Sequence, residues 1–225
     1  MIRSSLAAAL ISGLLLIVAG SDAFAQQTTF TINDYGNSTD WNPGDGIAET
    51  APGNNRTTMR AAIEEANALS GPVVIQFEPQ TYGSQLSVNW SPIDFWYGPS
   101  AFPAISSEIT IEGNGIRIIK TTSTDQRAFF VSGDPTARSL PLPGEGTLTL
   151  REVSLENFEA VGGRGGDNGR NSGGGGLGAG GAIYNQGTLT IERSSFVSNR
   201  AEGGSATSTD GSNYSGTGGG GMGGR

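Results

Sequence analysis

Apolar and polar residues alternate in short runs along much of this chain. The clearest run is Gly-Thr-Leu-Thr-Ile at residues 187–191, which Phe196 follows after a polar stretch. In an extended chain Leu189 and Ile191 point to one face and the threonines to the other, which predicts a half-buried strand. If fully buried, each of Leu189, Ile191 and Phe196 contributes roughly 1.5–3 kcal/mol. So short a segment cannot enclose three such side chains, so it needs neighbouring strands.

The same pattern occurs earlier in the chain. Residues 146–154 repeat residues 187–195 at a spacing of 41, and residues 109–112 are a weaker earlier copy. Short strands that return after variable loops indicate a chain that winds on itself and stacks like residues about 4.8 Å apart. We therefore predict an all-β fold, specifically a right-handed parallel β-helix.

One helix is expected, at residues 57–69. Met59, Ala62, Ile63, Ala66 and Leu69 recur at steps of three and four, and Ser-Gly-Pro at residues 70–72 ends the run. Because a β-helix has an apolar end and a free strand edge, we expect this helix to cap the first turn. Further strands are expected at residues 28–32, 72–77, 109–111, 115–119 and 128–131.

Two N-terminal features leave alternatives open. Aromatic residues at 82–103 either stack on sugar rings from an exposed face or pack as an irregular loop over the first strands. Asp34, Asp40 and Asp45 either gather around a cation or are solvated loop carboxylates, and their spacing matches no EF-hand loop. We favour the packed loop and the solvated carboxylates.

Composition divides the chain. Residues 1–25 have the basic start, apolar core and Ala-Phe-Ala end of an export signal. Residues 26–71 hold the first strand, a polar loop and the capping helix, and residues 72–160 the first β-helix rungs. Residues 161–225 contain 23 of the 37 glycines, and we predict projecting glycine-rich loops around one further rung. Because residues 218–224 resemble the lead-in at 174–181, we expect either the N-terminal part of a longer β-helix or a truncated gene product.

The charge balance and missing residue types exclude several functions. The net charge of −8 argues against nucleic acid as a partner, and beyond residue 25 we expect no membrane insertion. Without histidine or cysteine, Ser-His-Asp and Cys-His catalysis and the usual zinc sites are impossible. Arg117 and Lys120 are the basic candidates for a sugar lyase, but strand alternation places them on opposite faces. We therefore name no catalytic, cofactor-binding or metal-binding residue.

Two short motifs carry a family resemblance. A GGAI segment followed by an FxxN segment is similar to the paired motifs of polymorphic outer membrane proteins. The residues concerned are Gly180, Gly181, Ala182, Ile183, Phe196 and Asn199. Residues 55–63 also resemble the CSLREA segment found near the N-terminus of exported β-helix proteins. The resemblance implies a β-helix displayed at the outer-membrane surface or released from the cell, with an adhesive role toward a host or matrix surface or a polysaccharide.

The sequence therefore favours an exported, non-catalytic β-helix scaffold. The alternative is a polysaccharide-active β-helix lyase or hydrolase whose catalytic rungs lie beyond residue 225.

Overall fold

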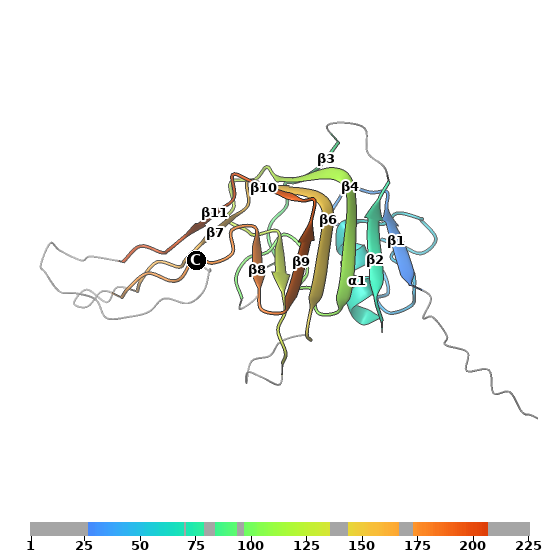
Figure 1. The fold of residues 1–225 in the computed structure, drawn as a ribbon, viewed down its shortest axis with the longest axis horizontal. Coiled ribbons are helices and arrows are strands. Elements are labelled where there is room, and N and C mark those ends of the chain that lie inside the picture. The colour runs from blue at the N-terminus through green and yellow to red at the C-terminus, as the bar shows by residue number, and fades with distance from the viewer. Residues whose placement is uncertain are drawn as a thin grey trace, which may run out of the picture.

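The computed structural model describes residues 27–69, 71–78, 84–93, 97–135, 144–166 and 173–206. The predicted export signal lies outside these residues. The described chain is mostly β, with one short helix and a large all-parallel sheet (Figure 1). In chain order its elements are β1 (Thr28–Ile32), α1 (Met59–Ala68), β2 (Val73–Phe77), β3 (Gln85–Val88), β4 (Glu108–Lys120), β5 (Phe129–Val131), β6 (Thr147–Glu156), β7 (Glu159–Val161), β8 (Ile183–Asn185), β9 (Thr188–Glu192), β10 (Ser195–Val197) and β11 (Arg200–Glu202).

Strands distant in sequence lie side by side. The main sheet runs in the order β1-β2-β4-β6, with β3 also on β4 and both β9 and β10 on β6. Two small sheets pair β7 with β11 and β5 with β8. Every pairing between these named strands is parallel, which requires a long connection between partners.

The spacing of 41 residues is the register of three strand pairs. Leu189 lies beside Leu148, Phe196 beside Leu155, and Ala201 beside Ala160. Ile109 lies beside Leu148, so the weaker earlier copy is also a strand of the same sheet. The predicted parallel stacking of like residues is therefore confirmed for these strands.

One expected boundary is wrong. Residues 109–111 and 115–119 were expected to form separate strands, but both belong to the 13-residue strand β4. Its register with β6 shifts between Glu112 and Ile116, where Asn114 has a φ of 49°. Asparagine tolerates this left-handed conformation, so the strand bends without ending. Glu152 and Arg193, 41 residues apart, have φ values of 53° and 46° at the equivalent bends.

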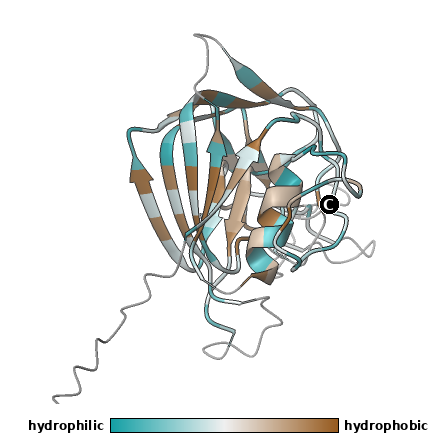
Figure 2. Ribbon diagram, turned by 90° about the vertical axis from the view of Figure 1, so that its right-hand side faces the viewer, coloured by the Kyte–Doolittle hydropathy of each residue, from teal (hydrophilic) through white to brown (hydrophobic). Residues whose placement is uncertain are grey.

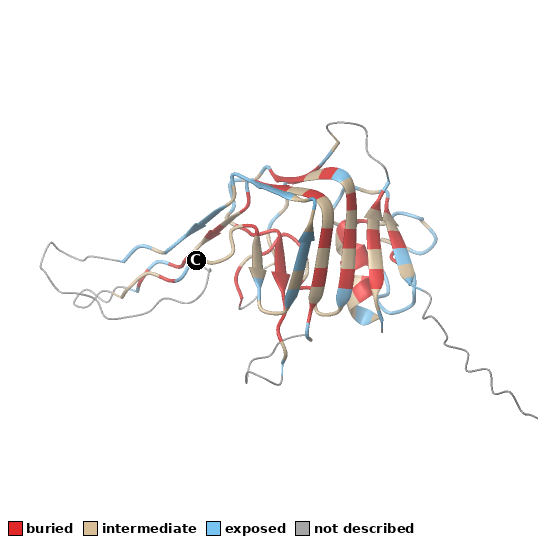
Figure 3. Ribbon diagram, in the orientation of Figure 1, coloured by how far each residue is buried: buried red, intermediate tan, exposed pale blue. Residues whose placement is uncertain are grey.

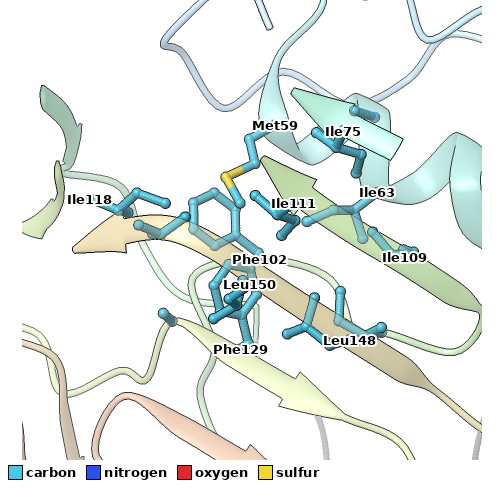
Figure 4. Packing of buried hydrophobic residues seen from close by; sticks show 14 of the residues in the cluster. Met59, Ile63, Ile75, Phe102, Ile109, Ile111, Ile118, Phe129, Leu148 and Leu150 are labelled. Atoms are coloured by element: carbon cyan, nitrogen blue, oxygen red, sulfur yellow. The ribbon is translucent and has the colours of Figure 1, made fainter. Parts of the chain in front are cut away.

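The core lies between the main sheet and the segments packed against it. Phe102 and Phe129 stack 5.3 Å apart and lie among the buried aliphatic side chains of β4 and β6 (Figure 4). The predicted apolar face of α1 is confirmed, since Met59 and Ile63 are fully buried. The helix lies against the face of the sheet formed by β1, β2 and β4 (Figure 2). Among the described residues, no helix is long and apolar enough to cross a bilayer.

The aromatic residues of the connection before β4 are packed. Tyr97 and Phe102 are buried, and the indole N–H of Trp90 donates to the Ala101 carbonyl at 3.0 Å. For Tyr97 and Phe102 the sugar-stacking alternative is therefore wrong. Phe95 and Trp96 lie outside the described residues.

Glycine-rich segments pack against one another by their backbones. Residues 162–166, 173–178 and 202–205, here called the glycine layer, extend beyond β7 and β11 (Figure 1). Gly162 donates to Glu202 at 2.8 Å, Gly176 to Gly163 at 2.7 Å, and Gly204 to Gly176 at 2.7 Å. Glycine lets the backbones approach closely enough to form these hydrogen bonds.

We expect Gly204→Ala to open the glycine layer locally. A Cβ at Gly204 would lie 2.0 Å from the Gly163 carbonyl oxygen, whereas one at Gly203 would meet only the Gly176 oxygen, at 3.8 Å. Hydrogen exchange of the Gly162 and Gly176 amides should accelerate about tenfold or more in Gly204→Ala, because the substitution lowers the free energy of local opening. Gly203→Ala is the adjacent control, and equal exchange in both variants would contradict the close packing.

Candidate functional site

An open hollow of about 400 Å³ lies where the stacked strands end. Its lining includes five of the six motif residues and the apolar side chains that first indicated a strand. The lining residues are Gly181, Ala182, Ile183, Leu189, Ile191, Phe196, Asn199, Arg200 and Ala201. We call this surface the end face.

The end face is apolar because, among the described strands, β9 and β10 have a partner on one side only. Leu148 and Leu150 of β6 are fully buried between β4 and β9. Their counterparts on β9, Leu189 and Ile191, are more accessible, and Ile191 is 45% exposed. Phe196 of β10 is 43% exposed. Exposed and intermediate positions make up β9 and β10, whereas buried positions recur along β6 (Figure 3). The same pattern that builds the core on β6 is therefore displayed to solvent on β9 and β10.

The GGAI residues connect this end face to the core. Gly180 has a φ of 65°, a conformation that favours glycine. The Ala182 carbonyl accepts from the amides of Ala128 at 2.8 Å and Phe129 at 3.2 Å. Ile183 opens β8, which pairs with β5. The motif thus has a structural role, fixing the chain beneath the hollow.

Asn199 of the FxxN motif bonds to the backbone of the preceding repeat. Its Oδ1 accepts from the Phe158 amide at 2.9 Å, and its Nδ2 donates to the Leu155 carbonyl at 2.8 Å. Both groups lie beside the bend at Asn157, whose φ is 62°. One side chain therefore satisfies two backbone groups that the bend removes from the regular strand ladder.

We expect Asn199→Ala to lower the free energy of unfolding by about 1–3 kcal/mol, because it leaves the Phe158 N–H and Leu155 C=O without these partners. Urea titrations followed by circular dichroism would measure the change. Asn185→Ala is the matched control, since Asn185 is exposed and its Oδ1 accepts only from the nearby Gly187 amide. A loss no larger than in the control would refute the structural role of Asn199.

Opposite charges follow one another along the stack. Arg151 lies between Glu112 and Glu192, with N···O distances of 2.6 Å and 2.9 Å. The pairs Glu152–Arg193, at 2.9 Å, and Glu159–Arg200 repeat the alternation. Our reading of the sequence missed these pairs. The signal was present, since Arg-Glu at 151–152 becomes Glu-Arg at 192–193, one repeat later.

The two basic residues considered for lyase chemistry have structural partners. Arg117 forms a two-pronged ion pair with Glu156, at 2.9 Å and 2.7 Å, and these hydrogen bonds hold the pKa of the Glu156 carboxyl below its usual value. Lys120 is buried, and its Nζ donates to the carbonyls of Thr122 and Thr124. The structure does not bring Arg117 and Lys120 together as a proton-abstracting pair.

The three N-terminal aspartates have separate environments. Asp34 pairs with Arg56 at 2.8 Å, and Asp45 accepts from Asn42 and from the Ile47 amide. Asp40 is buried beside Glu65 and accepts from the Glu49 amide. Among the described residues, no group of three or more histidine, cysteine, aspartate or glutamate side chains is placed to hold a metal ion.

Arg127 is a buried cation that the sequence analysis did not identify. Arg127 is 1% exposed and donates to the carbonyl oxygens of Tyr97 at 2.5 Å and Ala179 at 3.2 Å. Its guanidinium carbon lies 5.5 Å from the centre of the Tyr184 ring. Burial lowers the pKa of Arg127 from its ordinary value. These contacts tie β5 to the segment before β8, so Arg127 serves the fold.

The chain matches no protein-family model, no curated protein and no solved structure. The class of this protein is therefore described by its architecture alone. It is a mostly β protein built on a large all-parallel sheet, with an apolar end face formed by its last described strands.

Proposed function

We propose that this chain is an exported, non-catalytic scaffold of the right-handed parallel β-helix type, whose role is adhesive binding at or near the outer-membrane surface. One observation carries the scaffold assignment. The constant register of 41 residues across β6/β9, β6/β10 and β7/β11 places like residues in line along the stack. This return of β9, β10 and β11 along β6 and β7 supports a chain that winds on itself.

Two further observations support a binding role. The resemblance of the GGAI and FxxN motifs is to adhesive surface proteins, and these residues line an exposed apolar hollow. Apolar patches with a polar rim mark interaction sites on many proteins. The engagement of Arg117 and Lys120 by structural partners weighs against lyase chemistry at these two residues.

The test compares binding with turnover. The full chain is incubated with immobilised acidic polysaccharides and matrix proteins, and both retained protein and released sugar ends are measured. We expect retention on at least one surface without release of unsaturated or reducing sugar ends. Release of such ends, abolished in no-protein controls, would favour the polysaccharide-active enzyme and overturn the proposal.

Export is tested separately. Fractionation of the source cells should recover the chain outside the cytoplasm, with a mature N-terminus near residue 26. Recovery of the intact N-terminus in the cytoplasm would contradict export.

A further inference from the structure

The end face presents a strand edge as well as an apolar surface. Among the described strands, β9 and β10 pair only with β6, and β11 pairs only with β7. An edge strand carries unpaired N–H and C=O groups that template a further strand. Leu189, Ile191 and Phe196 stand beside this edge and provide the apolar contact that a paired strand needs.

The charges at the end face specify what the added strand carries. Glu112, Arg151 and Glu192 alternate in sign along the stack, and Glu152 and Glu159 are each followed by an arginine. A strand added beside β9, β10 and β11 would continue each of these series of residues in register. Opposite charges then favour a basic residue beside Glu192 and acidic residues beside Arg193 and Arg200.

A second copy of this chain fits this charge pattern poorly. Its free edge at the opposite end of the sheet is β1, and the register places Thr31 in the same line as Gln76, Glu112, Arg151 and Glu192. A copy docked through β1 would thus set an uncharged threonine over Glu192. The net charge of −8 adds repulsion between copies.

We infer that the end face binds an extended segment of another polypeptide, which adds a parallel strand to β9 and β10 with alternating apolar residues, a basic residue over Glu192 and acidic residues over Arg193 and Arg200. This inference rests on the proposed binding scaffold and names the partner chemistry of its end face. Backbone hydrogen bonds supply affinity in this mode, and the charged positions supply register and selectivity.

The chain itself contains the sequence that best matches this description. Residues 145–161 carry Arg151, Glu152 and Glu159 in the register that complements β9 to β11. A labelled synthetic peptide with this sequence is therefore the probe, titrated with the full chain and followed by fluorescence anisotropy. The control peptide has the same sequence except for Arg151→Glu, Glu152→Arg and Glu159→Arg, which reverse these three charges and change the net charge of the peptide from −3 to −1.

We expect saturable binding of the first peptide and binding about tenfold or more weaker for the control peptide, with the difference shrinking at high salt. The protein variant Arg193→Glu with Arg200→Glu should reverse part of this preference. Ile191→Glu should abolish binding while leaving the circular dichroism spectrum unchanged, because Ile191 is already 45% exposed.

Three results would overturn the inference. They are no saturable binding, equal affinity for both peptides, and concentration-dependent oligomers of the chain alone in sedimentation velocity, which would make a second copy the occupant. None of these results alters retention on polysaccharide or matrix surfaces. Conversely, release of sugar ends would overturn the proposed function without changing the peptide affinities.

Discussion

Phe129→Ala is expected to lower the free energy of unfolding by about 3–5 kcal/mol, the range for removing a fully buried phenyl ring. Phe129 is fully buried and stacks on Phe102 at 5.3 Å with an interplanar angle of 22°. It joins β5 to the core beneath β4 and β6 (Figure 4), and in so closely packed an interior the cavity left by the ring is refilled only in part. For a domain of ordinary stability, this loss is a large fraction of the total free energy of unfolding.

Phe196→Ala is the matched control for this experiment. The substitution is chemically identical, but the Phe196 ring is 43% exposed on the end face, so the expected loss is below about 1.5 kcal/mol. Urea titrations of both variants, with unchanged m values, would measure the difference. Equal losses of stability in the two variants would mean that the Phe196 ring is as buried in solution as the Phe129 ring. The end face would then not be exposed.

Alternation along the chain carried most of the information about the main sheet. The runs at residues 146–154 and 187–195 predicted their own parallel pairing, because strands with the same apolar alternation can align in register with their apolar side chains on one face. The apolar spacing of Met59, Ala62, Ile63 and Ala66 likewise predicted the buried face of α1. These are local periodicities, and each depends on side chains a few residues apart.

Features that depend on backbone geometry or distant partners were not predictable in this way. The bend at Asn114 looks like a turn between two strands in sequence, because a left-handed residue interrupts the pattern equally in both cases. The glycine layer has no side-chain pattern at all, since its contacts are backbone to backbone. Arg127 became a core residue only because the carbonyls of Tyr97 and Ala179, distant in sequence, converge on it.

The apolar side chains of the end face could be predicted from the sequence, but its charge pattern was missed. Leu189, Ile191 and Phe196 were expected to point to one side, and the hollow that they line bears this out. Its charge pattern required a comparison of the repeats for opposite signs in addition to like residues. Such an exchange of charges at a fixed spacing is a sequence signal for parallel stacking, because like charges in register would repel.

Asp40 should make the protein less stable as pH rises from about 4 to above 6. Asp40 is 6% exposed, and burial, followed by a hydrogen bond with Glu65 and repulsion from its charge, raises the pKa of Asp40 to about 6. Glu65 is fully buried and accepts from the amides of Gly44 and Gly46. The backbone amide of Asp40 donates to Glu64 Oε2 at 2.8 Å, and Asp40 Oδ1 accepts from the backbone amide of Glu49 at 3.0 Å.

The sign follows from proton linkage. Because the pKa of Asp40 in the folded chain exceeds the ordinary aspartate value of 3.8, the folded chain binds a proton on Asp40 that the unfolded chain has released. This stabilisation is fully present below about pH 4 and is lost as pH rises through about 6, and its full size is of order 1–3 kcal/mol. Above pH 6 the two carboxylates repel each other in a buried setting.

Asp40→Asn is expected to remove this pH dependence and to raise the free energy of unfolding at pH 7.5 by about 1–3 kcal/mol relative to the native chain. The asparagine amide can donate to Glu65 as the protonated carboxyl does, and its Oδ1 can still accept from the Glu49 amide. Urea titrations at pH 4.5, 6.0 and 7.5 would measure the effect. Asp45→Asn removes the same charge from an exposed site in the same loop and should leave the pH dependence in place. If both variants behave alike, net charge alone governs the loop, and Asp40 and Glu65 do not share a proton.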